Sequence, residues 1–270
     1  MPELPEVETV RRSLHRLLEG KRIAQVEVRE RRLRKPLSPT FAASLENRTI
    51  CRVDRRGKYL CLGLDNGQVW VVHLGMTGRL LVENHSGQSF SHDHVMILFS
   101  DGLRLHYSDA RRFGLMAVRE QAEIAEFHGL GVEPLGKEFT PVYLWAKSRP
   151  TRRAVKDLLM DQRVVAGIGN IYANEILFRA GVRPIRRAYR LKKGQIGRVV
   201  AATRAVLSEA IRYRGSSISD YLDGRGRRGA FQNRFRVYDR EGQPCLVCAT
   251  AIKRLTQGGR SSFFCPWCQQ

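Results

Sequence analysis

The sequence predicts an α+β fold in three parts: an N-terminal β-sandwich, a helical domain and a C-terminal β-hairpin that carries four cysteines. Three observations lead to it. Short strand-like runs occupy about residues 23–118, helical periodicity begins near residue 154, and two Cys-x-x-Cys pairs stand near the C-terminus. The expected divisions are 1–133 for the sandwich, 134–150 for a linker, 151–230 for the helical domain and 231–270 for the hairpin.

The N-terminal part begins with one helix and continues as strands. Apolar residues at helical spacing predict a helix over 9–19 that stops at Gly20. Asn66-Gly67 and Asp101-Gly102 are hairpin signals between apolar runs. The predicted strands are 23–28, 50–53, 59–64, 69–74, 95–99 and 103–107. Many short strands with regular turns favour a sandwich.

The second part shows the helical period. Helices are predicted at 154–160 and 170–179, with Asn170 as N-cap and Gly181 as C-cap of the second. A long amphipathic helix follows over 196–211 and ends near Gly215. A polar loop rich in Gly and Arg then covers about residues 216–229.

Four cysteines predict a metal site. Cys245 and Cys248 form one Cys-x-x-Cys knuckle, and Cys265 and Cys268 form another after 16 intervening residues. Two knuckles supply four thiolates in tetrahedral geometry, which leaves no open position and indicates one structural Zn²⁺ ion. A pair of disulfides is the less favoured alternative. The two remaining cysteines, Cys51 and Cys61, are expected to be buried and structural.

The residues between the knuckles alternate around Gly258-Gly259, which predicts a β-hairpin with a basic tip. Arg260 follows the turn directly. From the hairpin alone, a phosphate contact and a solvated side chain are equally good interpretations of Arg260.

The charge balance points to a polyanionic partner. The 270 residues include 47 Lys and Arg against 26 Asp and Glu, a formal net charge of +21. Nucleic acid is the first candidate and an anionic membrane surface is the second. No apolar run is long enough to span a bilayer, and the acidic N-terminus is unlike a signal peptide. These features predict an intracellular protein.

The chain starts Met1-Pro2-Glu3. Removal of Met1 would leave Pro2 with a free secondary amine, whose pKa of about 8 keeps a useful fraction unprotonated. Such an amine can attack a sugar carbon and form an iminium directly. Glu3 places a carboxyl beside it that can move protons. Taken alone, Pro2 is more often only a common second residue.

Other short motifs suit DNA. Gly167-Ile168-Gly169-Asn170 opens a helix, whose N–H groups can bind a phosphate, although the glycines can also simply form a tight turn. Lys58 begins a strand after Arg55-Arg56-Gly57, where it can bind phosphate, move protons or remain solvated. His92, in His92-Asp93-His94, is interpreted as a phosphate contact rather than a second metal ligand.

Two loops at strand ends carry bulky tips. Met76 stands in the first loop, and Arg111 and Phe113 in the second. Such side chains can insert into a base stack, although each of the apolar ones taken alone is more often core. Basic clusters at 31–35, 149–153 and 183–193 add salt-sensitive affinity for nucleic acid.

Together these motifs resemble the formamidopyrimidine-DNA glycosylase family along essentially the whole chain. The resemblance rests on the start Pro2 to Thr9, Arg111-Arg112-Phe113-Gly114, 167–173 and the four cysteines. It implies a helix–two-turns–helix element in the helical domain and DNA bound in the cleft between domains. It also implies excision of oxidised purines from damaged double-stranded DNA by a cytoplasmic repair enzyme associated with the nucleoid. One cleft with one reactive terminus predicts a monomer.

The resemblance also implies residue roles. Pro2 corresponds to the Schiff-base nucleophile, Glu3 to the acid that opens the sugar ring, Lys58 to a lysine of phosphate contact and elimination, and Arg260 to the hairpin arginine beside the lesion. The implied DNA contacts are Glu6, Met76, His92, Arg111, Phe113, Arg152 and Asn170. Ala110 departs from the proline usual there, and the loop over 216–229 is the expected cover of the damaged base.

The implied reaction begins with eversion of the damaged base. Attack by Pro2 releases the base, and β,δ-elimination then cuts the strand on both sides. Two alternatives stay open. One is an endonuclease VIII-like glycosylase for oxidised pyrimidines. The other is a non-catalytic zinc-ribbon protein that binds DNA, which leaves Pro2-Glu3 without a reason.

Overall fold

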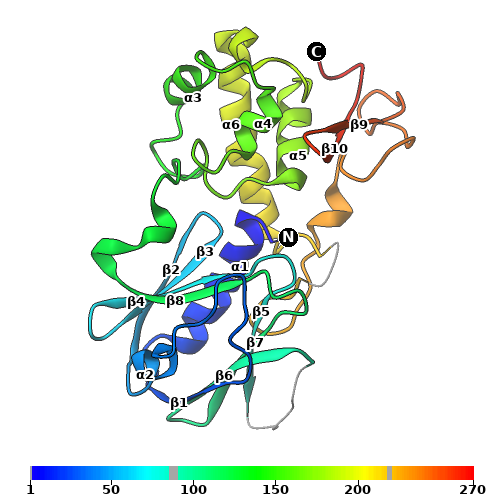
Figure 1. The fold of residues 1–270 in the computed structure, drawn as a ribbon. Helices are drawn as coiled ribbons and strands as arrows, with labels where there is room; N and C mark the ends of the chain where they lie inside the picture. Colours follow the sequence, from blue (N-terminus) through cyan, green and yellow to red (C-terminus); the bar gives the residue numbers. More distant parts are fainter. Residues whose placement is uncertain (1, 85–90, 218–220) are drawn as a thin grey trace. The chain divides into compact units, whose positions relative to one another are not determined.

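The chain folds into two compact units, each assembled from two segments. The computed structural model describes residues 2–84, 91–217 and 221–270. The first unit combines Met1–His128 with Arg214–Ala230, and the second combines Gly129–Tyr213 with Phe231–Gln270 (Figure 1). The chain thus leaves the first unit and returns to it, so the predicted loop over 216–229 belongs with the sandwich rather than with the helices.

The first unit is a sandwich of two antiparallel four-stranded sheets, as predicted. Their orders are β1-β6-β7-β5 and β2-β3-β4-β8. The strands are β1 (Ile23–Val28), β2 (Ile50–Arg56), β3 (Tyr59–Leu64), β4 (Gln68–His73), β5 (Arg79–Asn84), β6 (Asp93–Phe99), β7 (Leu103–Ser108) and β8 (Leu115–Glu120). Phe99 and Leu105 of one sheet share a core with Leu62 and Trp70 of the other. Strands β5 and β8 were not predicted from the sequence.

Helix α1 (Leu4–Leu18) packs its apolar face into this core through Val7, Val10 and Leu14. It begins five residues before the predicted start at residue 9, because Pro5 lies in the first turn, where a missing N–H costs nothing. Three short elements complete the unit: α2 (Phe41–Leu45) and the 3₁₀ turns η1 (Gln121–Glu123) and η2 (Ala125–Phe127).

The second unit is helical. Its helices are α3 (Pro141–Ser148), α4 (Val155–Met160), α5 (Asn170–Ala180) and α6 (Lys193–Arg212), with 3₁₀ turns η3 (Ala188–Arg190) and η4 (Phe231–Arg234). Helix α3 lies inside the segment predicted as a linker. Thr140 caps it by accepting a hydrogen bond from the Tyr143 N–H, and Leu144 is fully buried in the core. The segment predicted as a linker therefore contains a capped helix that packs into the core of the second unit.

Helix α5 differs from the prediction at one end. Its N-cap is Gly169, so Asn170 is the first helical residue rather than the cap. Gly181 adopts the left-handed conformation expected of a C-cap, with φ of +67°. Helix α6 starts three residues before the predicted residue 196 and ends at Arg212.

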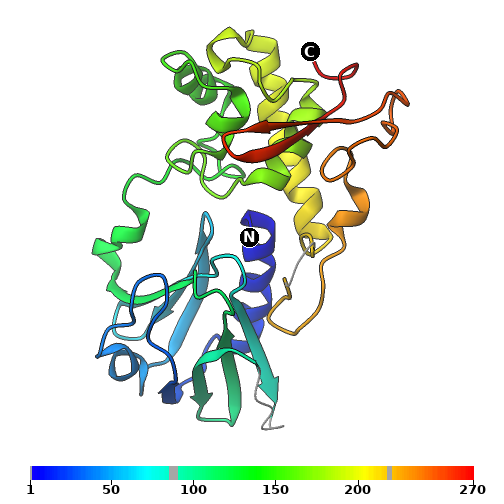
Figure 2. The same cartoon turned by 45° about the vertical axis from the view of Figure 1, so that its right-hand side comes forward.

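The C-terminal hairpin joins β9 (Lys253–Gln257) to β10 (Arg260–Phe264) (Figure 2). Gly258 and Gly259 both have positive φ, +54° and +71°, as a type I′ turn requires. The predicted hairpin is confirmed. Within the described ranges, no helix is both long and apolar enough to cross a membrane.

Candidate active site and metal centre

The predicted nucleophile and acid stand at the start of α1. Pro2 is buried and Glu3, 3% exposed, is the N-cap of the helix. Glu3 and Glu6 form a capping box in which the Glu3 N–H donates to Glu6 Oε2 at 2.9 Å. The reactive pair predicted from the sequence is therefore fixed by a regular helix start.

Glu6 also binds the returning segment of the unit. Its Oε1 accepts hydrogen bonds from the Ser216 N–H at 2.7 Å and from the Ser216 hydroxyl at 3.2 Å. Gly215 lies so close that an added Cβ would stand 2.6 Å from Glu6 Oε1, and its φ is +73°. The Tyr221 hydroxyl donates to the Glu6 carbonyl at 3.1 Å.

Glu6, 2% exposed, therefore has its carboxylate engaged by the protein itself. Burial, followed by the negative charge of Glu6, raises the pKa of Tyr221 far above its ordinary value. The Tyr221 hydroxyl stays protonated as a donor. Both ends of the predicted lesion loop are held inside the first unit, while residues 218–220 of that loop lie outside the described residues.

Lys58 directly precedes β3 and is 7% exposed. The turn that carries it is tied to α1 because Arg55 donates to Glu8 at 3.1 Å and to the Gly57 carbonyl at 3.0 Å. Burial, with the charges of Lys58 and Arg34, lowers the pKa of His73 to about 4. The neutral His73 Nδ1 accepts the Gly75 N–H at 3.0 Å and so supports the loop that carries Met76.

The three residues predicted to fill a base stack are exposed. Met76 is 37% exposed and Phe113 is 45% exposed, so neither side chain belongs to the core of the sandwich. Arg111 is also exposed, and its guanidinium lies 4.6 Å from the centre of the Phe113 ring. The interpretation of Met76 and Phe113 as ordinary core is therefore wrong.

Both tip loops are joined by Asp109, which the sequence analysis missed. This carboxylate is fully buried. Oδ1 accepts the Thr77 hydroxyl at 2.5 Å, and Oδ2 accepts the Gly114 N–H at 2.8 Å and the Tyr107 hydroxyl at 3.1 Å. Thr77 in turn accepts the Arg111 N–H at 3.1 Å.

Only glycine fits at position 114, since an added Cβ would stand 1.7 Å from the Tyr107 oxygen. Burial and the Asp109 charge raise the pKa of Tyr107 well above its usual range, so the phenol remains a donor. One buried carboxylate thus fixes the two loops relative to each other.

His92 is exposed with a left-handed φ of +63°. Its neighbours point to other partners: Asp93 accepts hydrogen bonds from His106 and Ser108, and His94 Nε2 lies 2.7 Å from the Asp109 carbonyl. Asp93 and His94 therefore form hydrogen bonds within the first unit, while the role of His92 as a phosphate contact stays a prediction.

In the second unit, Asn170 lies at the start of α5 and donates to the Ser261 carbonyl of the hairpin at 3.1 Å. Arg260, exposed at the start of β10, adjoins this contact. Lys156, 1% exposed, donates to the Ser261 carbonyl at 2.9 Å and to the Ser262 hydroxyl at 2.7 Å. Asn174 accepts the Phe263 N–H at 2.8 Å.

These contacts place the hairpin on the N-terminal half of α5 and on α4. Lys156 and Asn174 were missed by the sequence analysis because their partners lie 105 and 89 residues away. Glu175 was missed too: its buried carboxylate accepts the N–H groups of Arg236, Val237 and Tyr238 at 2.9–3.0 Å. It fixes the segment that leads to the first cysteine knuckle.

Arg152 is exposed just before α4, and its carbonyl accepts a hydrogen bond from Arg187 at 2.9 Å. The two units therefore divide the predicted residues. Pro2, Glu3 and Lys58 belong to the first unit. The second unit holds Arg152, Asn170, Arg260 and the four cysteines.

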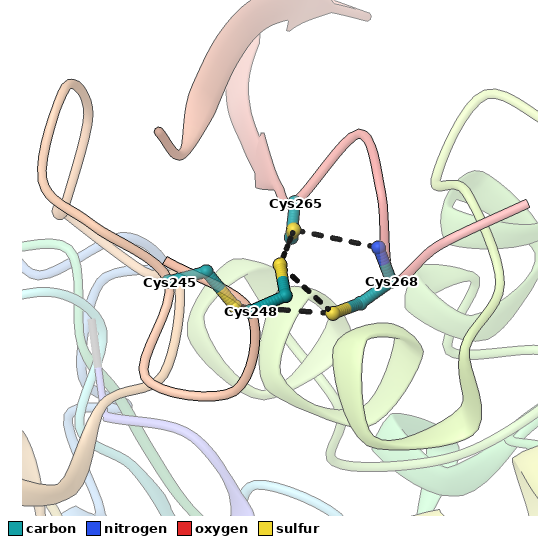
Figure 3. A group of neighbouring side chains, drawn as sticks. All are labelled: Cys245, Cys248, Cys265 and Cys268. Carbon is teal, nitrogen blue, oxygen red and sulfur yellow. Dashed lines mark hydrogen bonds between the residues drawn. The ribbon is translucent and has the colours of Figure 1, made fainter. Parts of the chain in front are cut away.

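The cysteines converge as a zinc site (Figure 3). Sγ of Cys248 lies 3.4 Å from those of Cys265 and Cys268, and Cys245 Sγ lies 3.9 Å from Cys268 Sγ. A tetrahedron with Zn–S bonds of about 2.3 Å requires sulfur separations of about 3.8 Å. The Val247 and Cys268 N–H groups point at Cys245 and Cys265 sulfurs, both at 3.4 Å.

This donor set fits one structural Zn²⁺ ion. Four protein ligands would complete the coordination, and Cys245 and Cys265 pack in one small cluster with Val237, Ile252 and Phe263, which a bound Zn²⁺ would stabilise. In the described ranges, no second set of three or more metal-ligating side chains converges in this way. Cys61 is buried as expected, whereas Cys51 is exposed on β2 and is not a core residue.

Comparison with known proteins agrees with the fold and the site. Three family models match: the formamidopyrimidine-DNA glycosylase N-terminal domain over residues 1–116, its H2TH domain over 130–221, and a zinc finger found in FPG and IleRS over 242–270. Formamidopyrimidine-DNA glycosylases from Dinoroseobacter shibae and Thioalkalivibrio sulfidiphilus are 44% and 43% identical, each with 100% of both chains covered.

Solved structures give the same result. MutM (Fpg) from Thermus thermophilus has a TM-score of 0.89 and 39% identity, covering 99% of this chain and 98% of the other. Lactococcus lactis Fpg in complex with DNA containing an abasic site has a TM-score of 0.92 and 32% identity, covering 99% of each. The chain therefore belongs to the formamidopyrimidine-DNA glycosylase family.

Proposed function

We propose that this chain is a base-excision repair enzyme that removes oxidised purines, 8-oxoguanine and formamidopyrimidines, from double-stranded DNA and then cleaves the abasic site. One observation carries the proposal: Pro2 and the buried Glu3 stand together at a fixed helix start in a chain that matches the glycosylase family throughout. Lactococcus lactis Fpg structures that hold Fapy-dG or abasic-site DNA support the substrate class.

The chemistry follows from the secondary amine. After removal of Met1, the Pro2 nitrogen attacks C1′ of the everted nucleotide, and the bond from C1′ to the base breaks. Glu3 supplies the proton that opens the sugar ring, which leaves an iminium between Pro2 and C1′. The iminium acidifies the C2′ proton. Its loss expels the 3′ phosphate, and a second elimination expels the 5′ phosphate.

The remaining residues bind and deform DNA. Lys58 assists the eliminations and contacts phosphate, and Arg260 binds the phosphates beside the lesion. His92, Arg152 and Asn170 contact the backbone, which suits the exposure of His92 and Arg152. Met76, Arg111 and Phe113 fill the space of the everted base, which suits their exposed positions on two rigid loops.

Glu6 has a supporting part in this proposal. It orients the Glu3 backbone and the lesion loop, since its carboxylate binds the N–H groups of Glu3 and Ser216. We further propose that the enzyme acts in the cytoplasm in association with the nucleoid, because its net charge of +21 favours a polyanionic partner. One N-terminal nucleophile per chain favours a monomer.

Borohydride trapping tests the nucleophile. A duplex with one 8-oxoguanine opposite cytosine is mixed with the enzyme and borohydride, and the covalent adduct is mapped by peptide mass spectrometry. We expect the adduct on a Pro2 that has lost Met1, a much lower yield of adduct with Pro2→Gly, and a normal adduct with the matched control Pro5→Ala. An adduct on a lysine, or undiminished trapping in Pro2→Gly, contradicts the role.

Glu3→Gln tests the acid. It should abolish release of 8-oxoguanine while leaving duplex affinity within about threefold, since no phosphate contact is removed. A panel of duplexes tests the substrate class. Faster release of thymine glycol than of 8-oxoguanine would assign the chain to oxidised pyrimidines instead.

A further inference from the structure

Six arginines lie together on the second unit. Of these, only Arg152 has a part in the proposed function, as a DNA contact. Two neighbouring hollows contain them: one lined by Arg183, Arg186, Arg187 and Arg190, the other by Arg149, Arg152 and again Arg187. We call these six residues the arginine track. The shared Arg187 makes it continuous with Arg152, the DNA contact implied by family resemblance.

The track is held together by the backbone that carries it. Residues 184–188 run beside 153–156: the Val155 N–H donates to the Arg186 carbonyl at 2.8 Å, and the Ala188 N–H donates to the Arg153 carbonyl at 2.9 Å. An isolated bridge pairs Ala154 with Arg187. The segment that follows α5 is thereby fixed against the start of α4.

The track lacks the counter-charges that other surface arginines have. Arg29 pairs with Glu27, Arg163 with Asp161 and Arg254 with Glu241. Among the described residues, no Asp or Glu side chain lies within ion-pair distance of a track arginine, and neither hollow is lined by an acidic side chain. Like charges gathered without partners repel one another, so an external anion is favoured there.

The guanidinium groups of Arg149 and Arg183 are also held in place by backbone carbonyls. Arg149 donates to the carbonyls of Ala188 at 3.1 Å and Leu191 at 3.0 Å and stacks 3.8 Å from the Trp145 ring. Arg183 donates to the Gln269 carbonyl at 3.0 Å. Arg186 has a buried Nε with no hydrogen-bond partner. A guanidinium has five N–H donors, so each keeps donors for phosphate oxygens, and less side-chain entropy is lost on binding.

We infer that the arginine track extends the DNA-binding surface past Arg152, so that it binds the phosphate backbone of duplex DNA flanking the lesion. The inference rests on the proposed function, because that function puts a duplex at Arg152. The track carries no base-reading side chain in this arrangement. It therefore adds affinity that depends on duplex length and salt and not on sequence.

The experiment compares duplexes of two lengths. One is about 12 base pairs, roughly 40 Å long at 3.4 Å per base pair, and the other about 36 base pairs, both with a central abasic-site analogue. The track variant is Arg186→Gln with Arg190→Gln, which leaves Arg149, Arg152 and the Arg187 hydrogen bond to the Arg152 carbonyl in place. The control, Arg29→Gln with Arg163→Gln, removes the same charge from arginines paired with carboxylates.

On the long duplex, we expect the track variant to make the negative slope of log affinity against log salt less steep by about 1.8, two phosphate contacts at about 0.9 each. On the short duplex, wild type and track variant should agree, and the control should match wild type on both. An unchanged slope on the long duplex overturns the inference. So does a loss of binding to anionic phospholipid vesicles with no change on DNA.

A separate assay distinguishes failure of the proposed function from failure of the inference about the arginine track. The single-turnover rate of 8-oxoguanine excision from the short duplex measures the chemical step without the flanking contacts. The track variant should keep the wild-type rate. A wild type that excises nothing refutes the proposed reaction, while its length-dependent binding still tests the track.

Discussion

The Glu6 carboxylate accepts the Ser216 N–H at 2.7 Å across 210 residues of sequence. Its other oxygen accepts the Glu3 N–H at 2.9 Å. The proposed acid and the loop expected to cover the damaged base are thus oriented by one side chain. Anything that disturbs Glu6 changes both together.

Glu6→Gln tests this coupling. An amide offers a single acceptor oxygen, so one of the two buried N–H groups loses its partner at a cost of about 1–3 kcal/mol in the free energy of unfolding. We expect urea denaturation to show that loss, and excision of 8-oxoguanine to slow at least about tenfold, or 1.4 kcal/mol. Cleavage of a preformed abasic site, which needs no base recognition, should slow less.

Glu27→Gln is the control, since Glu27 is only partly buried and, among the described residues, forms its ion pair with its neighbour Arg29. Equal slowing of excision and abasic-site cleavage by Glu6→Gln would show that Glu6 serves the common chemical step and not the loop.

Asp109→Asn should loosen the loops that carry Met76 and Phe113. The carboxylate accepts three hydrogen bonds, from Thr77, Tyr107 and Gly114, and an amide nitrogen in place of one oxygen cannot accept. We expect a loss of about 1–3 kcal/mol in unfolding free energy and slower base eversion. Stopped-flow fluorescence of 2-aminopurine beside the lesion measures the eversion.

Thr77→Val is the milder partner variant, because it removes one donor to Asp109 and the acceptor of the Arg111 N–H. It should slow eversion without a large stability loss. Normal eversion kinetics in Asp109→Asn would show that the loops hold their geometry without the carboxylate.

His73 predicts a pH dependence of stability. Burial lowers its pKa from about 6.5 to about 4, so the folded protein stays unprotonated there while the unfolded chain binds a proton. Stability is therefore complete above pH 6.5 and falls as the pH drops toward 4. The loss contributed by His73 between pH 7 and pH 5 should be about 1–2 kcal/mol.

The measurement is the urea midpoint of wild type and His73→Gln at both pH values. Other groups titrate equally in the two proteins, so the difference between them isolates His73. Parallel curves for the two proteins would mean that His73 is protonated in the fold.

Cys265→Ser should remove zinc and weaken DNA binding together. The zinc cluster orders β10, and β10 presents Arg260 beside the contact between Asn170 and Ser261. We expect metal analysis to show less than one zinc per chain and affinity for an abasic-site duplex to fall at least about tenfold. Cys51→Ser, which changes an exposed free thiol, is the control. A zinc-free variant with full affinity for the duplex would show that DNA binding does not depend on the zinc-ordered hairpin.

Local signals explain what could be predicted. Asn66-Gly67 and Asp101-Gly102 located two hairpins because each turn type demands those residues. The sequence analysis did not predict strands β5 and β8, because several of their residues, among them Leu115, Met116 and Glu120, favour helices when isolated. In the fold, pairing with β7 and β4 makes both segments strands. The sequence analysis did not predict helix α3, because the prolines on either side of it suggested a linker.

The residues of the candidate site also divide into those with a local sequence signal and those without one. The cysteine knuckles and Pro2-Glu3 are contiguous motifs, so the sequence displays them. Asp109, Lys156 and Glu175 act through partners 32, 106 and 62 residues away, at Thr77, Ser262 and Val237, and no local pattern reports such pairs. Their chemistry became visible only when the fold brought the partners together.

The division of the first unit between two distant segments has a consequence for biosynthesis. During translation Glu6 leaves the ribosome long before Ser216 exists, and the unit lacks residues 214–230 until nearly the whole polypeptide has been made. A nascent or prematurely terminated chain that ends before residue 214 therefore lacks the Ser216 N–H and hydroxyl that Glu6 binds in the complete fold. The start of α1, where the proposed acid Glu3 lies, gains this contact only after the second segment of the unit has been made.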